Sequence, residues 1–272
     1  MKSFVHRIIT LFRGVASMPD LGKSIPWPEP PPVLTKFVTY AQQIHARWRA
    51  KVILLRIPVR DRPEVQLKAI AYGALSHRRE KWGYNRKWFG NYLTLQSENP
   101  NVRDFETALT HLRHSHSFDK VLFACLVTKI NKRCKQQDRA IVVTDTNIFK
   151  LDPRKHFQRK KSPLSLATVE GVSISTSHDQ AFIVHFQGGK DLLFYMVTAQ
   201  NENRVAELVA VLCQICQRKF GKNLQVTVAS PLTCRLGGKQ KELHFQEDRV
   251  AKPYLRKQSN QQMVLFWPSA SF

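Results

Sequence analysis

Five cations lie close together in one short stretch of the sequence, and residues of these types at this spacing are suited to binding a polyanion. Apolar runs at 121–128 and 140–144 flank the stretch, and both are typical of buried β-strands. Two strands joined by a basic loop would hold the charges at one rim of a domain. Because Arg can bind phosphate with paired hydrogen bonds while Lys acts as a point charge, we expect this rim to bind a phosphorylated lipid headgroup. The five cations are Lys129, Lys132, Arg133, Lys135 and Arg139.

A second group of cations follows the next expected strand and would add to the same attraction. The alternative is that both groups only keep the surface soluble, because the whole chain carries a formal charge of +23. A charge of this size favours nucleic acid or an anionic membrane without deciding between them. The sequence has no aromatic-rich RNA-binding signature and no zinc finger, so a nonspecific nucleic-acid binder is the less favoured hypothesis. The second group comprises Lys150, Arg154, Lys155, Arg159, Lys160 and Lys161.

Catalytic and metal-binding constellations are not found in the sequence. There is no Walker-type phosphate loop and no Gly-x-Ser-x-Gly elbow. Cys213 and Cys216 have the spacing of half a zinc or redox motif, but no second ligand pair accompanies them. His111, His114 and His116 cluster near an expected helix end without a completing carboxylate or thiolate. We therefore expect no enzymatic activity, no cofactor and no metal.

The cellular setting follows from the cysteines and the hydropathy. The five cysteines are an odd number at scattered spacing, which is typical of a reducing compartment. No apolar run approaches the roughly 20 residues that a membrane span requires, and no secretory signal is visible at the N-terminus. A cytosolic or nuclear protein is expected.

The residue pattern in the first half of the chain predicts helices, and these helices must help to position the charges. We expect helices over 2–13, 34–57, 85–95 and 104–114, and one that begins near Pro63 with Asp61 as its cap. A proline-rich connector at 26–32 separates the first two helices. Its composition favours a role as a rigid spacer over a role as a ligand for an SH3 domain. The apolar residues of 34–57 recur at helical spacing and predict a stripe that faces the core. This stripe consists of Phe37, Tyr40, Ile44, Trp48, Val52 and Leu55.

The second half changes to the period of strands. Short strands are expected at 121–129, 139–144, 148–151, 164–175, 180–186 and 192–197, followed by a strong helix over 203–220 that Gly221 ends. Further strands at 224–229, 232–236 and 243–246 precede a loose polar tail at 248–260 and an apolar segment at 263–267 that docks on the body. The pattern predicts an α+β fold, with a helical N-terminal segment packed on a β-barrel or sandwich that a long helix closes.

Several collinear segments carry a resemblance to a known family. The stretch from Lys129 to Arg139 with the following Ala-Ile-Val-Val-Thr-Asp, the segment 148–153, the run 203–209 and the ending Leu-Phe-Trp-Pro at 265–268 resemble the tail homology 1 domain of class I unconventional myosins. The Trp-Pro-rich connector, 47–50 and 88–92 resemble the segment that follows the neck in the short-tailed branch of that family. The resemblance covers the chain from about Asp20 onward.

The resemblance implies a pleckstrin-homology-like domain that binds anionic phospholipids, including phosphoinositides, at the cytoplasmic face of the plasma membrane or endosomes in the actin-rich cortex. Lys129 and Arg139 would be the signature cation pair. It also implies five parts: a neck remnant (1–18), the connector (19–33), a helical post-neck part (34–118), the pleckstrin-homology-like core (119–247) and a docking tail (248–272).

The N-terminal segment resembles a degenerate calmodulin-binding IQ motif, in which Ile8, Arg13 and Gly14 match and Ile9 replaces the expected Gln. The resemblance thus implies weak or no binding of calmodulin or a related light chain through this helix. Actin would be contacted through a motor that this chain lacks, so that the chain is expected to be an excerpt of a longer protein. A scaffold for cargo proteins, of unknown identity, is the other alternative.

Overall fold

The computed structural model describes residues 32–79, 82–198, 202–250 and 252–268. The expected helix over 2–13, the IQ-like residues Ile8, Arg13 and Gly14, and nearly all of the connector lie outside the described residues. The chain divides into two compact units, Met1–Arg60 and Asp61–Phe272. In the described part, no helix combines the length and the apolar character that crossing a membrane would need.

The described part of the first unit is one long helix, α2 (Pro32–Arg56), which confirms the expected helix over 34–57. Its apolar stripe does not face a core, however, and this expectation was wrong. No residue of α2 is buried, and Phe37, Ile44 and Trp48 are 60–68% exposed. Helical spacing of apolar residues shows that they share a face, but it does not show that something covers that face.

Helices α3 (Arg62–Leu75) and α4 (Val102–Ser115) open the second unit, as expected. A 3-10 turn, η1 (Val59–Asp61), precedes α3; Asp61 occupies its N-cap position without a capping side-chain hydrogen bond, and a proline lies in the first turn. The expected helix over 85–95 was wrong, because only η2 (Tyr92–Thr94) is helical there. Gly90 adopts φ +70° and accepts a hydrogen bond from the N–H of Ala124, so this segment runs along a strand instead.

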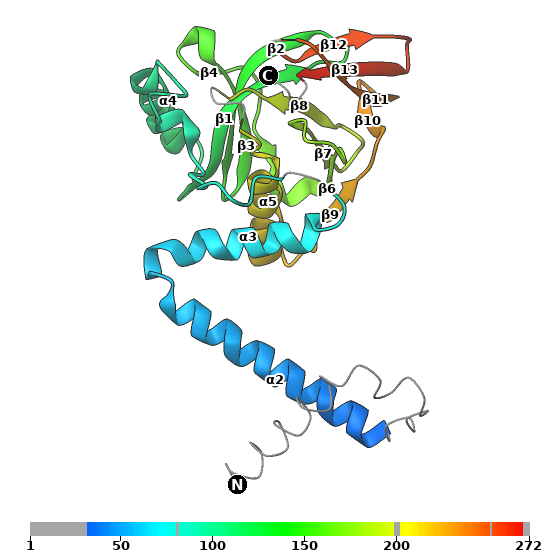
Figure 1. Cartoon of the computed structure of the whole chain (residues 1–272). Coiled ribbons are helices and arrows are strands. Elements are labelled where there is room, and N and C mark those ends of the chain that lie inside the picture. The colour runs from blue at the N-terminus through cyan, green and yellow to red at the C-terminus, as the bar shows by residue number, and fades with distance from the viewer. Residues whose placement is uncertain (1–31, 80–81, 199–201, 251, 269–272) are drawn as a thin grey trace. The chain divides into compact units, whose positions relative to one another are not determined.

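The main sheet holds nine strands in the order β4-β3-β2-β1-β8-β7-β6-β9, with β5 paired to β3 (Figure 1). All of its pairs are antiparallel except β6 with β9. The single strand expected over 164–175 is instead split into β5 and β6 by the turn η4 (Leu166–Thr168). The strands are β1 (Val121–Ile130), β2 (Gln136–Thr144), β3 (Asn147–Asp152), β4 (Gln158–Arg159), β5 (Leu164–Ser165), β6 (Val169–Ile174), β7 (Ala181–Phe186), β8 (Leu192–Met196) and β9 (Gln225–Val228).

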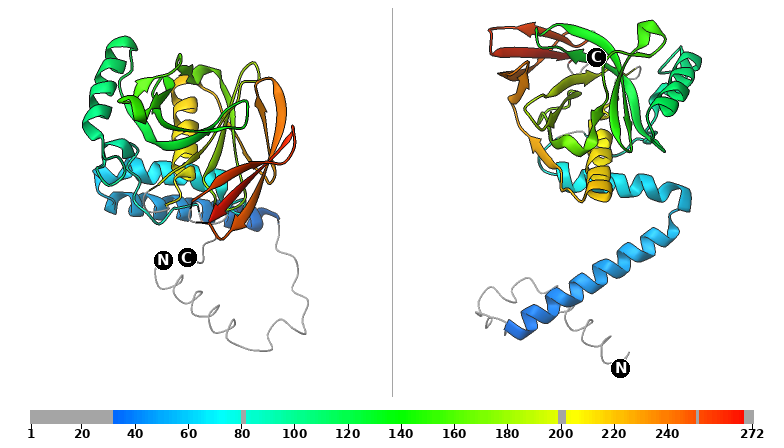
Figure 2. Two further views of the ribbon diagram at one scale, coloured as in Figure 1. Left: turned by 90° about the horizontal axis from the view of Figure 1, so that it is seen from above. Right: turned by 180° about the vertical axis from the view of Figure 1, so that it is seen from behind.

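Helix α5 (Val205–Phe220) packs its apolar face into the sheet and ends at Gly221, which adopts the left-handed conformation expected of a helix stop. Its buried side chains, Leu208 and Leu212 among them, share one hydrophobic cluster with Phe123, Val127 and Phe182 of the strands. The views of Figure 2 show α5, in yellow, beside the curved sheet. The sheet and the helix that closes it confirm the expected α+β fold.

A second sheet, in the order β10-β11-β13-β12, covers the other face of β7 and β8. Strand β13 contains the segment 263–267 and pairs in parallel with β11, so this segment docks on the body as expected. The tail at 248–260 is less loose than expected, because β12 pairs with β13 and the ring of Tyr254 stacks on that of Phe266 at 4.6 Å. The strands are β10 (Leu232–Leu236), β11 (Lys239–Asp248), β12 (Tyr254–Lys257) and β13 (Gln262–Pro268).

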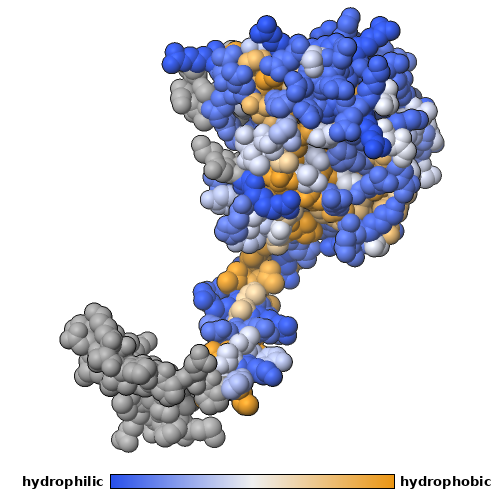
Figure 3. Space-filling model, turned by 90° about the vertical axis from the view of Figure 1, so that its right-hand side faces the viewer, coloured by the Kyte–Doolittle hydropathy of each residue, from blue (hydrophilic) through white to orange (hydrophobic). Residues whose placement is uncertain are grey.

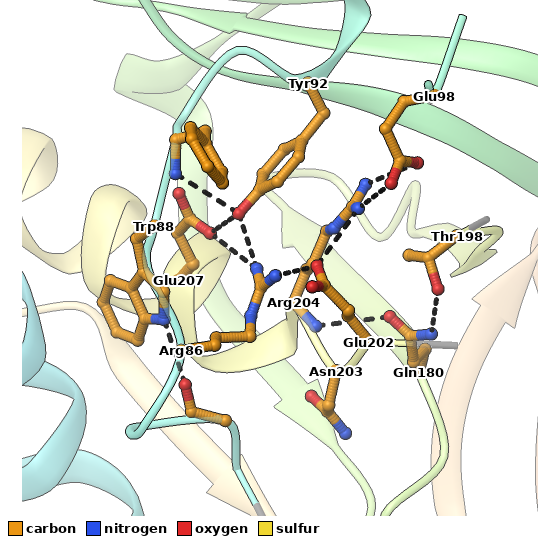
Figure 4. A network of polar contacts seen from close by, with 12 residues as sticks. Arg86, Trp88, Tyr92, Glu98, Gln180, Thr198, Glu202, Asn203, Arg204 and Glu207 are labelled. Atoms are coloured by element: carbon orange, nitrogen blue, oxygen red, sulfur yellow. Dashed lines mark hydrogen bonds and ion pairs between the residues drawn. The ribbon is translucent and has the colours of Figure 1, made fainter. Parts of the chain in front are cut away.

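A buried polar network fixes the segment between α3 and α4 against the start of α5 (Figure 4). Arg204 is 1% exposed, donates hydrogen bonds of 2.5 and 3.2 Å to Glu98 and lies 3.6 Å from the ring centroid of Tyr92. Tyr92 donates to Glu207, which also accepts from the backbone N–H of Gly90 at 2.7 Å. Burial, above all, raises the pKa of Glu207. Because the charged groups of this network pair with one another, we assign the network a structural role.

Candidate anion-binding site

Lys129 and Arg139 lie within strands and not in the loop between them. Strand β1 continues to Ile130 and β2 begins at Gln136, so the loop is only the five residues 131–135. Lys129 lies opposite Gln137, and Arg139 lies opposite Val127. Because side chains alternate along a strand, Lys129 shares the face of Val127, and Arg139 shares the face of Ile141, both of which line the core. The pair therefore extends the inner face of the sheet toward its open end.

Lys150 joins this pair from the third strand, although the sequence placed it with the second basic group. It lies opposite Ile141 and shares a face with Ile148, which also lines the core. Burial and the charges of Lys129 and Lys161 lower the pKa of Lys150 to about 8. Burial and the charges of Lys161 and Arg139 likewise lower the pKa of Lys129. Three neighbouring strands thus hold cations that destabilise one another.

Neither Lys129 nor Lys150 forms an ion pair with any carboxylate of the described residues. Arg139 differs, because its guanidinium lies 3.6 Å from the carboxylate of Asp152, which also contacts Lys160 at 3.3 Å. Burial acts to raise the pKa of Asp152, but the hydrogen bonds from Lys160 and the backbone of Arg154 and the charge of Arg139 lower it overall. Asp152 therefore orients Arg139, whereas the two lysines lack a counter-ion in the described part of the chain.

A cleft of about 820 Å³ opens beside Lys129. One wall is the turn between β10 and β11, with Leu236, Gly237 and Gly238, so the second sheet completes the site. Local sequence signals could not have found this wall or Lys190, because both come from other parts of the chain. Half of the fourteen lining residues are cations, against a single acid, Asp191. These cations are Lys129, Lys132, Arg133, Arg139, Lys160, Lys161 and Lys190.

The loop from 131 to 135 is held in one conformation by its own backbone. The side-chain oxygen of Asn131 accepts hydrogen bonds from the N–H groups of Arg133 at 2.8 Å and Lys135 at 3.1 Å. Lys132 packs on the second sheet so closely that a Cβ at Gly237 would come within 2.9 Å of the Lys132 Cβ. Lys132, Arg133 and Lys135 are exposed, and Lys135 does not line the cleft. The loop therefore holds its charged side chains on a backbone of fixed conformation.

The structure separates the remaining cations of the second group. Lys160 and Lys161 line the cleft of Lys129, whereas Arg154, Lys155 and Arg159 line another cleft, of about 910 Å³, against α4. Arg154 also pairs with Asp138 of β2, which does not line this α4 cleft. His111 and His156 also line it, and His156 lies 2.8 Å from the carboxylate of Asp104. The expected second basic patch is therefore two surfaces, one of which belongs to the Lys129 site.

Ser173, His185 and Asp191 are arranged like a catalytic relay. The hydroxyl of Ser173 lies 2.6 Å from His185 Nε2, and His185 Nδ1 lies 3.1 Å from Asp191. Ser173 is 6% exposed and does not line the adjacent cavity, and Asp191 accepts a 2.6 Å hydrogen bond from the backbone N–H of Arg235. A nucleophile must be accessible to substrate, so the relay joins the two sheets and does not catalyse.

The cysteines and histidines noted in the sequence are not assembled into a site. Burial, followed by the charge of Cys216, raises the pKa of Cys213 to about 11, and burial also raises that of Cys216. A search of the described residues finds no group of three or more His, Cys, Asp or Glu able to hold a metal ion.

Comparison with known proteins adds evidence independent of this geometry. Residues 79–267 match the family described as "Unconventional myosin tail, actin- and lipid-binding". The chain is 37% identical over 243 residues to human unconventional myosin-Id, covering 88% of this chain and 24% of that protein. It is 32% identical over 262 residues to mouse unconventional myosin-Ig, covering 95% and 25%. The chain thus spans about a quarter of the length of these curated relatives.

Solved structures are similar to this chain only at lower sequence identity and with low TM-scores. The hSac2 domain of human phosphoinositide phosphatase Sac2 is 11% identical with a TM-score of 0.35, covering 46% of this chain and 86% of that one. The pleckstrin homology domain of human oxysterol-binding protein-related protein 11 is 18% identical with a TM-score of 0.30, covering 37% and 83%. At these scores neither likeness carries an argument about the site.

Proposed function

This chain belongs to the family of class I unconventional myosin tails, as its sequence resemblance indicated, and from that premise we propose that it is a peripheral membrane module. It would bind anionic phospholipids, including phosphoinositides, and attach a longer actin-based motor protein to the inner face of the plasma membrane or endosomes. The family description names lipid as a ligand, and it supplies the class of partner.

One observation carries the choice of site: Lys129 and Lys150 have lowered pKa values and no ion-pair partner in the described residues. Lys129 lines the cleft and Lys150 does not, so a phosphate bound there would attract Lys129 directly and offset the repulsion between the two lysines. Arg139, oriented by Asp152, is suited to bidentate contact with a phosphate. Lys132, Arg133 and Lys135 would add about 1 kcal/mol each near an anionic surface, because they are exposed on the loop.

The shape of the cleft favours a multiply phosphorylated headgroup over diffuse attraction. Its cations approach from β1, β2, the fixed loop and the segment after β4, while the turn at Gly237 and Gly238 closes one wall. Charges that converge from several directions can contact more than one phosphate of a ring. We therefore expect phosphoinositide isomers to differ in affinity even at equal total charge.

The test compares two double variants that remove the same charge. Lys129→Ala with Arg139→Ala should reduce cosedimentation with phosphoinositide vesicles by at least tenfold and abolish the difference between isomers. Lys132→Ala with Lys135→Ala should weaken binding to all anionic vesicles by less, and the preference among isomers should survive. If both double variants lose equal affinity, binding is diffuse and the assigned pair is wrong.

Actin is a second candidate ligand of the tail itself, because the family description names actin beside lipid. The sequence had indicated actin contact only through the absent motor. Cosedimentation with actin filaments, repeated with saturating anionic vesicles, tests this candidate: competition would place both ligands on one basic surface. Binding of calmodulin or a light chain by the N-terminal segment and binding of cargo proteins remain predictions.

A further inference from the structure

Helix α2 exposes a long apolar stripe. Ten of its large apolar residues are at least 45% exposed, and six lie along one face: Val33 (76%), Phe37 (68%), Tyr40 (65%), Ile44 (66%), Trp48 (60%) and Leu55 (67%). Apolar (orange) surface is visible among hydrophilic (blue) side chains along this helix in Figure 3. Exposure of so much contiguous apolar surface marks an interaction site.

The charge of α2 limits the kinds of partner that could bind its apolar stripe. The helix carries five cations, Lys36, Arg47, Arg49, Lys51 and Arg56, and no acidic residue. With Ile44 taken as the centre of the stripe, Arg47 lies at its edge and Arg49 on the far side, given 100° per residue. Lys51 falls within the stripe, where its long side chain can reach the water while its methylene groups stay in the apolar layer. A basic helix with an exposed stripe of aromatic and aliphatic residues resembles helices that lie in a membrane interface, and here two further exposed apolar residues, Val38 and Ile53, lie outside the stripe.

We propose that α2 lies flat in the interface of an anionic membrane, with the stripe from Val33 to Leu55 inserted among the acyl chains. This inference rests on the proposed membrane attachment and adds a contact of different chemistry. The Lys129 site would recognise phosphate, whereas α2 would bury apolar surface and be attracted by the leaflet charge. Two contacts on one chain would retain it on the membrane far longer than either alone.

The helix itself supplies a matched control. Ile44 and Ile53 are nine residues apart, which is two and a half turns, so they lie on opposite faces. Their exposed fractions are similar, 66% and 54%. Ile44→Glu should lower the affinity of the full chain for phosphatidylserine vesicles about tenfold or more, because it removes one buried aliphatic side chain and adds a charge to the inserted face. Ile53→Glu, with the same change in composition, should lower it less than threefold.

Trp48 reports insertion directly. Vesicles of brominated lipid should quench the fluorescence of the wild-type chain more than that of Trp48→Phe, and this difference should vanish in Ile44→Glu. Equal effects of Ile44→Glu and Ile53→Glu, or no quenching from Trp48, would overturn the inference and leave the stripe for a protein partner. Circular dichroism of each variant checks that α2 remains helical.

The two proposals fail separately. If the Lys129→Ala, Arg139→Ala double variant keeps full preference among phosphoinositides while Ile44→Glu weakens binding, the headgroup site is wrong and α2 stands. If the double variant loses the preference while Ile44→Glu binds as the wild type does, α2 is wrong and the headgroup site stands.

Discussion

Replacing Lys150 with Gln should stabilise the unliganded protein at pH 7. In the folded chain the pKa of Lys150 falls to about 8 from 10.5, so the fold disfavours its charge. A shift of this size corresponds to about 3 kcal/mol at full value. Because Lys150 is only half-buried, solvent screening reduces the expected gain to about 1 kcal/mol. For a domain of this size such a gain raises the Tm by roughly 2–4 °C.

The pH dependence follows from the direction of the shift. Below pH 8 Lys150 is protonated in both the folded and the unfolded chain, so its full destabilisation is present. Between pH 8 and 10.5 the unfolded chain binds more protons, and the stability contributed by this group rises with pH. The advantage of Lys150→Gln over the wild type should therefore shrink across this window and be absent above it. Phosphate bound in the cleft that Lys129 and Lys161 line would offset the repulsion that these two cations exert on Lys150, which does not itself line the cleft. A soluble polyphosphorylated inositol should therefore stabilise the wild type more than the variant.

Urea unfolding at pH 7 and at pH 10.5, with and without the inositol, measures these differences. Lys155→Gln is the matched control, because Lys155 is exposed and lies in the α4 cleft, not in the Lys129 cleft. The reasoning is refuted if Lys150→Gln is no more stable than Lys155→Gln at pH 7, or if its advantage persists unchanged at pH 10.5.

Two further perturbations test the frame of the site and of the fold. Gly237→Ala should weaken headgroup binding several-fold in a vesicle titration, since the added Cβ would displace Lys132, whereas Gly188→Ala, at a similar positive φ but with open space around it, should cost stability and leave binding unchanged. Arg204→Ala should lower the free energy of unfolding by about 3–5 kcal/mol in a urea titration, because it removes the buried cation that pairs with Glu98 and Glu202; a loss below 1 kcal/mol would contradict the assigned role of the network.

Strand and helix positions could be predicted wherever the local pattern decides the structure. The apolar runs at 121–128 and 140–144 and the apolar residues of 205–216 each face a core, and Gly221 ends α5 as expected. The segment 85–95 could not be read in this way. Its aromatic residues pack along β1 and around Glu207, and the contacts that prevent a helix come from residues more than thirty positions away.

The candidate site, too, could be predicted from the sequence only where local pattern decides the structure. Alternation along β1 and β2 places Lys129 and Arg139 on one face, and the basic residues themselves are plain in the sequence. The sequence could not show that Lys150 shares their face across β2 while Arg154 and Arg159 turn toward α4. It could not supply Lys190 or the glycine turn either, because these depend on how the second sheet docks.

The parallel pairing of β11 with β13 has a consequence for the order in which the protein can mature. Ile130, at the end of β1, shares a hydrophobic cluster with Met263, Leu265 and Trp267, so this end of β1 is fully covered only after β13 exists. Contacts between such distant parts of a chain form late and slow the overall folding rate. A ribosome releases the chain from its N-terminus onward. A nascent chain that still lacks residues 262–268 has β11 without its partner β13, so the turn that forms one wall of the cleft beside Lys129 is not yet supported.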